Sequence, residues 1–173
     1  GISLNIDNSA YDNNIELVKT LNPDSPKYNY FGFLKLHDNK LYTCNGKGWD
    51  FGEPASIQIY DLDNNEWTTF ENISIEEKYG KKYKDIMTVD VDPMDSKHLF
   101  AGNQMGLFEF YDGELTQRWY DKNSPIYSHY NVSPGNENYQ VITSIKYDNE
   151  CNLWIINTGS SNSTLLKLSK NRS

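Results

Sequence analysis

The chain has 173 residues, and its 24 acidic residues against 16 lysines and arginines give a formal net charge of −8. This acidic balance argues against a nucleic-acid surface, because phosphate binding needs clustered lysine and arginine. No apolar run approaches the roughly 18–20 residues that a membrane-spanning helix requires, and two cysteines do not make a disulfide framework.

Three segments of the chain look like copies of one unit. They begin at Phe31, Ile86 and Ile142, which are 55 (86 − 31) and 56 (142 − 86) residues apart. Each is a strand-like apolar segment followed by a turn and a second short apolar segment. A repeat of this kind is typical of radially repeated β-architecture, mainly β-propellers. We therefore expect an all-β chain built from propeller blades, each a four-stranded antiparallel sheet.

The beginning of the chain is interpreted as the end of an earlier copy. Residues 16–19 leading into 24–28 resemble residues 114–118 leading into 123–127. Residues 1–28 are therefore predicted to be the closing strands of a preceding blade. The chain then holds about three blade-equivalents, whereas propellers close with about 4–8 blades, so we expect it to be a fragment of a larger propeller.

The remaining residues divide into two full blades and a partial one within the same propeller domain. The predicted boundaries are 29–83 for the first blade, 84–140 for the second and 141–173 for the partial blade. In the second blade, Asp112-Gly113 separates two strand patterns. This pair is a strong short-range signal for a β-hairpin.

Alternation of apolar and polar residues within the predicted strands gives a candidate core. Its expected members are Leu34, Leu36, Val89, Val91, Leu99, Phe100, Leu107, Phe108, Ile145, Leu153 and Trp154. If Trp154 is buried, its replacement by alanine should cost about 3–5 kcal/mol of stability.

Several motifs resemble a known repeat family. The turn from Asp92 to His98, with the pattern D-P-x-D-x-x-H, the strand Gly106-Leu107-Phe108-Glu109-Phe110 and the Asp112-Gly113 hairpin are similar to the two-component-regulator propeller repeat. Asn123-Ser124-Pro125 resembles a step in its PorZ-like members, which are secreted or surface propellers of bacteria that use type IX secretion. Residues 148–154 resemble the family's D-x-x-G-N-L-W signature, with Cys151 in place of glycine.

This resemblance implies a location outside the cytoplasm, in the periplasm or at the cell surface, with any signal peptide already removed. It implies a sensor input, a glycan-linked receptor module or a surface-attachment component. The family's repeat motifs are scaffold motifs, so no catalytic residue is carried over with them.

The residues themselves give little sign of catalysis or of a cofactor. No H-E-x-x-H motif or C-x-x-C pair is present, so no metal site or cofactor is expected. The carboxylates of Asp90, Asp92 and Asp95 lie close together in the sequence and are suitable ligands for a cation. Asp92, however, is better interpreted as the start of a turn. His37 and His98 occupy equivalent turns, which favours a structural role for both.

Two connections are candidate ligand or partner sites. The longer one, residues 46–54, carries Trp49, Phe51 and Glu53 among glycines, and its aromatic faces suit a sugar ring or a protein partner. Alternatively, Trp49 packs into the gap between blades. The second connection, residues 127–139, includes His129 and Tyr130.

Two classes of function remain open. The first is a non-enzymatic propeller that binds a protein or a glycan and contacts the remaining blades of its own propeller. The alternative is a fragment of a carbohydrate-active enzyme, either a glycoside hydrolase or a lyase. Glycosidases need two facing carboxylates, and the sequence alone does not pair them.

Overall fold

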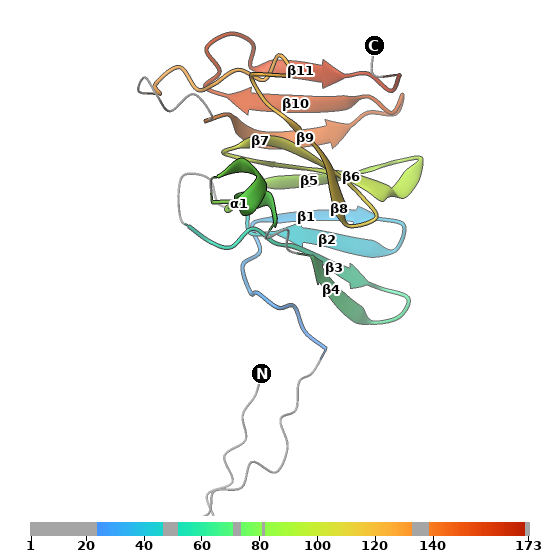
Figure 1. The fold of residues 1–173 in the computed structure, drawn as a ribbon. Coiled ribbons are helices and arrows are strands. Elements are labelled where there is room, and N and C mark those ends of the chain that lie inside the picture. Colours follow the sequence, from blue (N-terminus) through green and yellow to red (C-terminus); the bar gives the residue numbers. More distant parts are fainter. Residues whose placement is uncertain (1–23, 47–51, 71–73, 81, 133–138, 172–173) are drawn as a thin grey trace, which may run out of the picture.

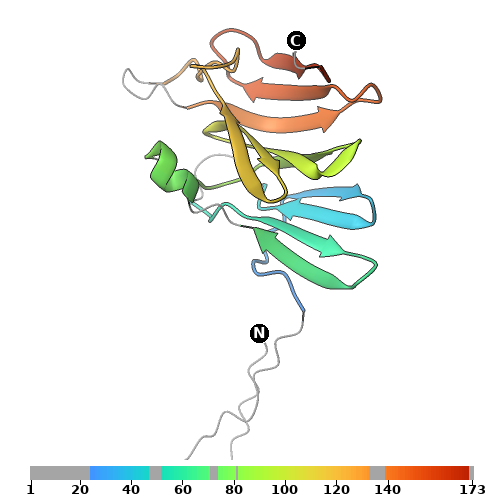
Figure 2. The same ribbon diagram turned by 45° about the vertical axis from the view of Figure 1, so that its right-hand side comes forward.

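The computed structural model describes residues 24–46, 52–70, 74–80, 82–132 and 139–171. These residues form three antiparallel sheets that lie one above another (Figures 1 and 2). The predicted all-β fold of propeller blades is therefore confirmed. The predicted closing strands within residues 1–23 lie outside the described residues, and the exact blade boundaries remain predictions.

Each sheet follows chain order, with neighbouring strands joined as hairpins. The first sheet contains β1 (Phe33–His37), β2 (Lys40–Cys44), β3 (Ile57–Asp61) and β4 (Glu66–Phe70). The second contains β5 (Thr88–Asp92), β6 (Asp95–Asn103), β7 (Gly106–Tyr111) and β8 (Glu114–Trp119). The third contains β9 (Val141–Tyr147), β10 (Leu153–Thr158) and β11 (Leu165–Leu168).

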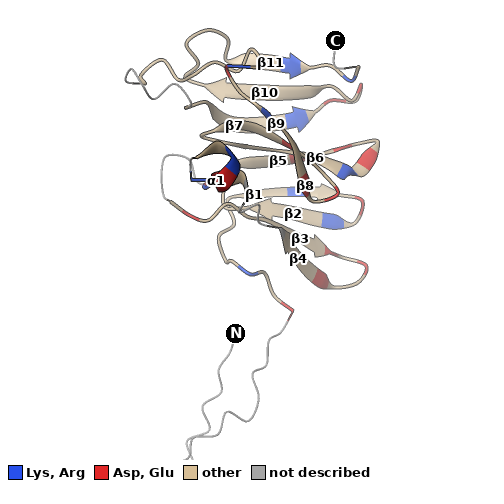
Figure 3. Cartoon of the chain, in the orientation of Figure 1, with Lys and Arg blue, Asp and Glu red and all other residues tan. Residues whose placement is uncertain are grey.

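One short helix, α1 (Ser74–Tyr79), lies in the connection between the first two sheets (Figure 1). Its Ile75 is fully buried in the core that these sheets share. Within the described part of the chain, no helix has the length and apolar character needed to cross a membrane. Lysine and arginine residues of that part are dispersed over the three sheets (Figure 3).

The turns use backbone conformations that their residues tolerate. Asp112 and Gly113, between β7 and β8, have φ values of 51° and 83°, as the predicted hairpin requires, because the favoured two-residue turn needs positive φ at both positions. Cys151, which replaces the glycine of the family signature, also lies in the left-handed region with φ of 62°. The turn before β10 thus keeps a glycine-like conformation without glycine.

The second sheet lies between the other two and supplies core residues to both. Val89 and Val91 belong to a buried cluster shared with Tyr42 and Ile57 of the first sheet. Phe100 packs in a second cluster with Ile142, Ile145 and Leu153 of the third sheet. The expected core residues that are confirmed as buried are Val89, Val91, Leu99, Phe100, Leu107, Phe108, Ile145 and Leu153.

Three expected core residues are instead exposed. Leu34 and Leu36 are 60% and 62% exposed, and Trp154 is 40% exposed. They alternate with the residues that face the second sheet, so they lie on the outward faces of the first and third sheets. The alternation located the strands correctly, but it did not show that these two faces lack a neighbouring sheet among the described residues.

Asp90 of β5 joins all three sheets. Its carboxylate is almost fully buried and contacts Lys35 Nζ of β1 at 2.7 Å. It also accepts a hydrogen bond of 2.7 Å from the backbone N–H of Tyr147 on β9. Thr88 Oγ1, two residues earlier, accepts another from Ile145 N at 3.2 Å. Buried charges are tolerated when they are paired and hydrogen-bonded, and here the partners come from both neighbouring sheets.

A buried asparagine recurs at the end of the second strand region of each sheet. Asn45, Asn103 and Asn157 are all at most 2% exposed. Asn103 Nδ2 donates to the Lys84 carbonyl at 3.0 Å, and Asn157 Nδ2 donates to the Tyr127 carbonyl at 2.8 Å. In the second and third sheets, this asparagine therefore fixes the connection that enters the sheet.

Replacing Phe100 and Trp154 by alanine should distinguish a covered face from an uncovered one. Phe100→Ala should lower the free energy of unfolding by about 3–5 kcal/mol, because it empties a buried site. Trp154→Ala should cost only about 1 kcal/mol, since it removes an exposed ring and its hydrogen bond to Asp148. Denaturant-induced unfolding of both variants measures the difference, and equal losses would contradict the assigned faces.

Candidate functional site

Only part of the first predicted loop lies in the described residues. Trp49 and Phe51 lie outside them. Glu53 is half-buried, and its backbone N–H donates to Asp85 Oδ1 at 3.0 Å, while Gly52 N donates to Oδ2 at 3.0 Å. Asp85 is fully buried, so its carboxylate anchors the end of this loop at the entrance to the second sheet.

The second predicted site is held by the third sheet. The backbone N–H of Tyr130 donates to the Gly159 carbonyl at 2.7 Å, and the His129 ring lies against Gly159, leaving no room for a Cβ there. The Tyr130 ring stacks on His129 at 4.7 Å and is 74% exposed. Glu53 and His129 are thus fixed by different parts of the chain, and a binding role for either stays a prediction.

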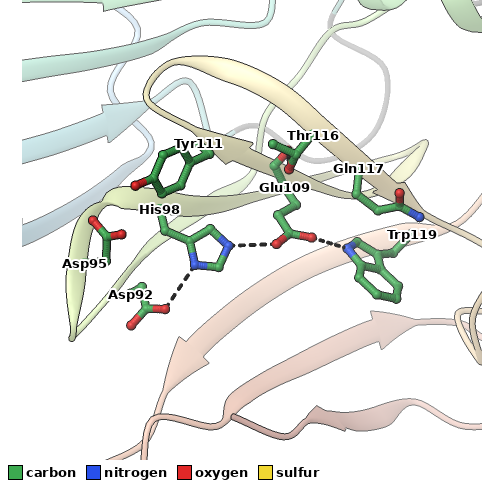
Figure 4. A pocket seen from close by; sticks show the side chains of 8 residues that line it. All are labelled: Asp92, Asp95, His98, Glu109, Tyr111, Thr116, Gln117 and Trp119. Carbon is green, nitrogen blue, oxygen red and sulfur yellow. Dashed lines mark hydrogen bonds and ion pairs between the residues drawn. The ribbon is translucent and has the colours of Figure 1, made fainter. Parts of the chain in front are cut away.

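A different feature brings polar and aromatic side chains together. An open groove of about 590 Å³ lies over the hairpins of the second sheet (Figure 4). Its lining residues are Asp92, Asp95, His98, Glu109, Tyr111, Thr116, Gln117 and Trp119. They come from all four strands of the second sheet, β5 to β8. From the sequence, His98 is expected to have a structural role, and no sequence motif marks Glu109 or Trp119 as site residues.

His98 is held between two carboxylates in this groove. Its Nδ1 lies 3.0 Å from Asp92 Oδ2, and its Nε2 lies 2.8 Å from Glu109 Oε1. A histidine donates from both ring nitrogens only when it is protonated. The hydrogen bond to Glu109 is the largest cause that raises the His98 pKa, and it outweighs the opposing effect of burial. The arrangement therefore favours an imidazolium.

The same network continues to the outermost strand of the sheet. Glu109 is only 3% exposed, and its Oε2 accepts a hydrogen bond of 3.0 Å from Trp119 Nε1 (Figure 4). Asp92, His98, Glu109 and Trp119 lie on β5, β6, β7 and β8 respectively. A continuous series of hydrogen bonds thus connects all four strands of the second sheet.

The third sheet has a counterpart of this network with different residues. Asp148, at the turn after β9, accepts hydrogen bonds from Asn152 Nδ2 at 3.0 Å and from Trp154 Nε1 at 2.8 Å. The bonds from Asn152, followed by the one from Trp154, lower the Asp148 pKa to about 2. Asn152 therefore holds the turn aspartate of the third sheet as His98 does in the second.

The acidic side chains that line the groove are hydrogen-bonded within the protein. Glu109 and Asp92 are both engaged by His98, and Asp95 accepts the backbone N–H of Lys97 at 3.0 Å. Tyr111, 46% exposed, presents an aromatic surface in the groove. Among the described residues, no group of three or more His, Cys, Asp or Glu side chains is placed to hold a metal ion. Away from the groove, Cys44 lies in the core between the first two sheets. Its burial raises the pKa of its thiol to about 12.

The signals that point to this groove are present in the sequence but depend on strand register. Phe100 pairs with Glu109 across β6 and β7, and Glu109 pairs with Gln117 across β7 and β8. The Asp112-Gly113 turn fixes the pairing of Phe110 with Leu115, and a register shift between Glu109 and Phe110 then places Glu109 opposite Gln117. Periodicity located these strands, but the register was needed to place Glu109 beside His98.

Comparisons with known proteins bear on the fold and the family. No family model matches the chain, and no curated protein matches it. Among solved structures, the chain is similar to PorZ, an essential bacterial surface component of the type IX secretion system of Porphyromonas gingivalis. The TM-score is 0.64 and the sequence identity 27%, over 80% of this chain and 18% of PorZ. The chain thus spans less than a fifth of PorZ.

A second solved structure is the extracellular domain of a protein from B. thetaiotaomicron that is assigned to a hybrid two-component system. It shares 15% identity with a TM-score of 0.40, over 87% of this chain and 22% of that one. The similarity to PorZ agrees with the PorZ-like propeller repeats that the sequence motifs resemble.

Proposed function

We propose that this chain is part of an extracytoplasmic β-propeller that binds a protein or glycan partner in a cell-surface assembly and catalyses no reaction. The observation that carries this proposal is the similarity to PorZ, a surface component of a secretion system, at 27% identity over 80% of the chain. A sensor role is the related alternative. The surface role is preferred because the structural similarity to PorZ is the stronger one.

The contacts in the groove support a binding role. The two carboxylates nearest His98, those of Asp92 and Glu109, line the groove but are each in hydrogen-bond contact with the His98 ring. A glycosidase needs two carboxyl groups available on either side of the scissile bond. Tyr111, Gln117 and Trp119 line the same groove, and aromatic faces beside hydrogen-bonding groups suit sugar rings or protein side chains.

Binding and hydrolysis are to be measured on the same set of glycans. We expect the chain to retain ligands on a glycan array without releasing reducing sugar from them. Tyr111→Ala should weaken that binding about tenfold, because it removes an aromatic face of the groove. Leu62→Ala, at an exposed turn of the first sheet, is the matched control and should bind like the wild type. Hydrolysis that Glu109→Gln abolishes would overturn the non-enzymatic proposal.

The pH dependence of the free energy of unfolding should show whether His98 stabilises the fold through its contacts with Asp92 and Glu109. Its folded pKa is raised, so its contribution to stability is complete below the unfolded value of about 6.5. That contribution is lost as pH rises through the raised folded pKa. His98→Gln should remove this part of the pH dependence of the free energy of unfolding. A variant with an unchanged stability profile would show that His98 does not hold the strands.

A further inference from the structure

The connection from β8 to β9 carries an exposed aromatic ring at the end of the third sheet. Tyr130 is 74% exposed, the highest value among the large hydrophobic side chains of the described residues. A single exposed hydrophobic side chain needs no explanation by itself. Tyr130 is distinguished by the number of contacts that hold it in place.

The backbone around Tyr130 is bonded to the hairpin between β10 and β11. The Tyr130 N–H donates to the Gly159 carbonyl at 2.7 Å, and the Ser161 N–H donates to the Ser128 carbonyl at 3.0 Å. Between these two bonds, His129 and Ser160 form an isolated β-bridge. Residues 128–130 are therefore fixed to the third sheet, and the surface they form lies within the described part of the chain.

The His129 ring supports the ring of Tyr130 from one side. The two rings stack with centroids 4.7 Å apart and an interplanar angle of 22°. The imidazole lies against Gly159, which has no room for a Cβ, and Tyr139 meets it edge-on at 6.1 Å. Its Nδ1 accepts the backbone N–H of Asn131 at 3.2 Å. Tyr130 thus has one face backed by a fixed ring and is otherwise largely open.

The residues beside this ring are polar and uncharged. Neither residues 127–132 nor residues 157–164 contain lysine, arginine, aspartate or glutamate. Asn131 from the first segment and Ser161, Asn162 and Thr164 from the second are exposed. Amides and hydroxyls of this kind both donate and accept hydrogen bonds. An open aromatic face is therefore accompanied by uncharged hydrogen-bonding groups.

This combination matches the chemistry of an uncharged sugar ring. A pyranose presents C–H groups on its face, which pack on the electron-rich face of an aromatic ring, and hydroxyls at its edge, which bond to amides and hydroxyls. A carboxylated or sulfated sugar finds no cation in either segment, and the net charge of −8 opposes it. A protein interface has an apolar centre wider than a single ring.

A fixed ring also lowers the cost of binding. A tyrosine that is already held in one orientation loses little side-chain entropy when a ligand packs on it. The contacts of His129 with Gly159, Tyr139 and Asn131 supply that order before any ligand arrives.

We propose that Tyr130 is the stacking surface of a second binding site, which takes an uncharged sugar ring, and that His129 is its positioning residue. This inference rests on the proposed function and specifies its glycan alternative. The site is separate from the groove, because the groove is lined by the second sheet whereas Tyr130 is held by the third.

The site is tested in a chain whose groove is already disabled by Tyr111→Ala. Saturation-transfer NMR measures its dissociation constants for neutral oligosaccharides of glucose, mannose and N-acetylglucosamine, and for oligogalacturonate as the acidic probe. At least one neutral probe should bind, and oligogalacturonate should not. Adding Tyr130→Ala should weaken the neutral probe about tenfold. Adding Tyr30→Ala is the matched control, since Tyr30 is also an exposed tyrosine stacked on a neighbouring ring, and should change nothing.

Two substitutions of His129 separate positioning of the ring from a general effect on the fold. His129→Ala removes the ring behind Tyr130 and should weaken the neutral probe about threefold. His129→Phe keeps an aromatic ring there and should restore the affinity. Thermal unfolding of both variants shows that they are folded at the temperature of the titration. Equal affinities for the alanine and phenylalanine variants would show that His129 does not position Tyr130.

The remaining outcomes separate this site from the proposed function. Sugar binding that is lost with Tyr111→Ala alone, or that Tyr130→Ala leaves unchanged, would overturn the site and leave the proposed function intact. Tighter binding of oligogalacturonate than of every neutral probe would also overturn it. A wild type that binds no sugar would overturn it too, leaving the proposed function with a protein partner. Hydrolysis of a probe that Glu109→Gln abolishes would contradict the proposed function and not this site.

Discussion

The stacking of the three sheets depends on the side chains of β5 that reach its neighbours. Asp90 is buried, and its carboxylate is bound by the ammonium group of Lys35 from the first sheet and by the backbone N–H of Tyr147 from the third. Apolar contacts between sheets are not directional, so they permit sliding. Hydrogen bonds and the ion pair of this buried carboxylate instead fix the separation and register of β1, β5 and β9.

The second and third sheets share the same strand arrangement, but different side chains hold the turn after their first strand. The turn aspartate of the second sheet is held by His98, and that of the third by Asn152. His98 connects onward to Glu109 and Trp119 across the second sheet, whereas Asn152 Oδ1 accepts the backbone N–H of Lys170 at 3.3 Å. A scaffold whose turns tolerate such exchange can vary its local surfaces without altering its blades.

The sequence predicted much of the fold because its signals are local. Alternation within strands and the Asp112-Gly113 turn identified the sheets and eight buried residues. The failures concern contacts between sheets. Leu34 and Trp154 follow the same alternation as buried residues, but they lie on faces that no other sheet of the described residues covers. Asp90 was grouped with Asp92 as a possible cation site, whereas Lys35 and Tyr147 N bind it, at a separation of more than fifty residues in each case. The groove was missed for a different reason, because the register of β6 and β7 within the second sheet is what places Glu109 beside His98.

The free energy of unfolding of Asp90→Ala, measured by denaturant titration, tests most directly whether this carboxylate holds the sheets together. The expected loss is about 1.5–3 kcal/mol, the range for hydrogen bonds to a charged group, because Lys35 is partly exposed and turns to solvent. Glu114→Ala, an exposed position on β8, serves as the control and should change stability by no more than about 0.5 kcal/mol. An Asp90→Ala variant as stable as this control would contradict the account.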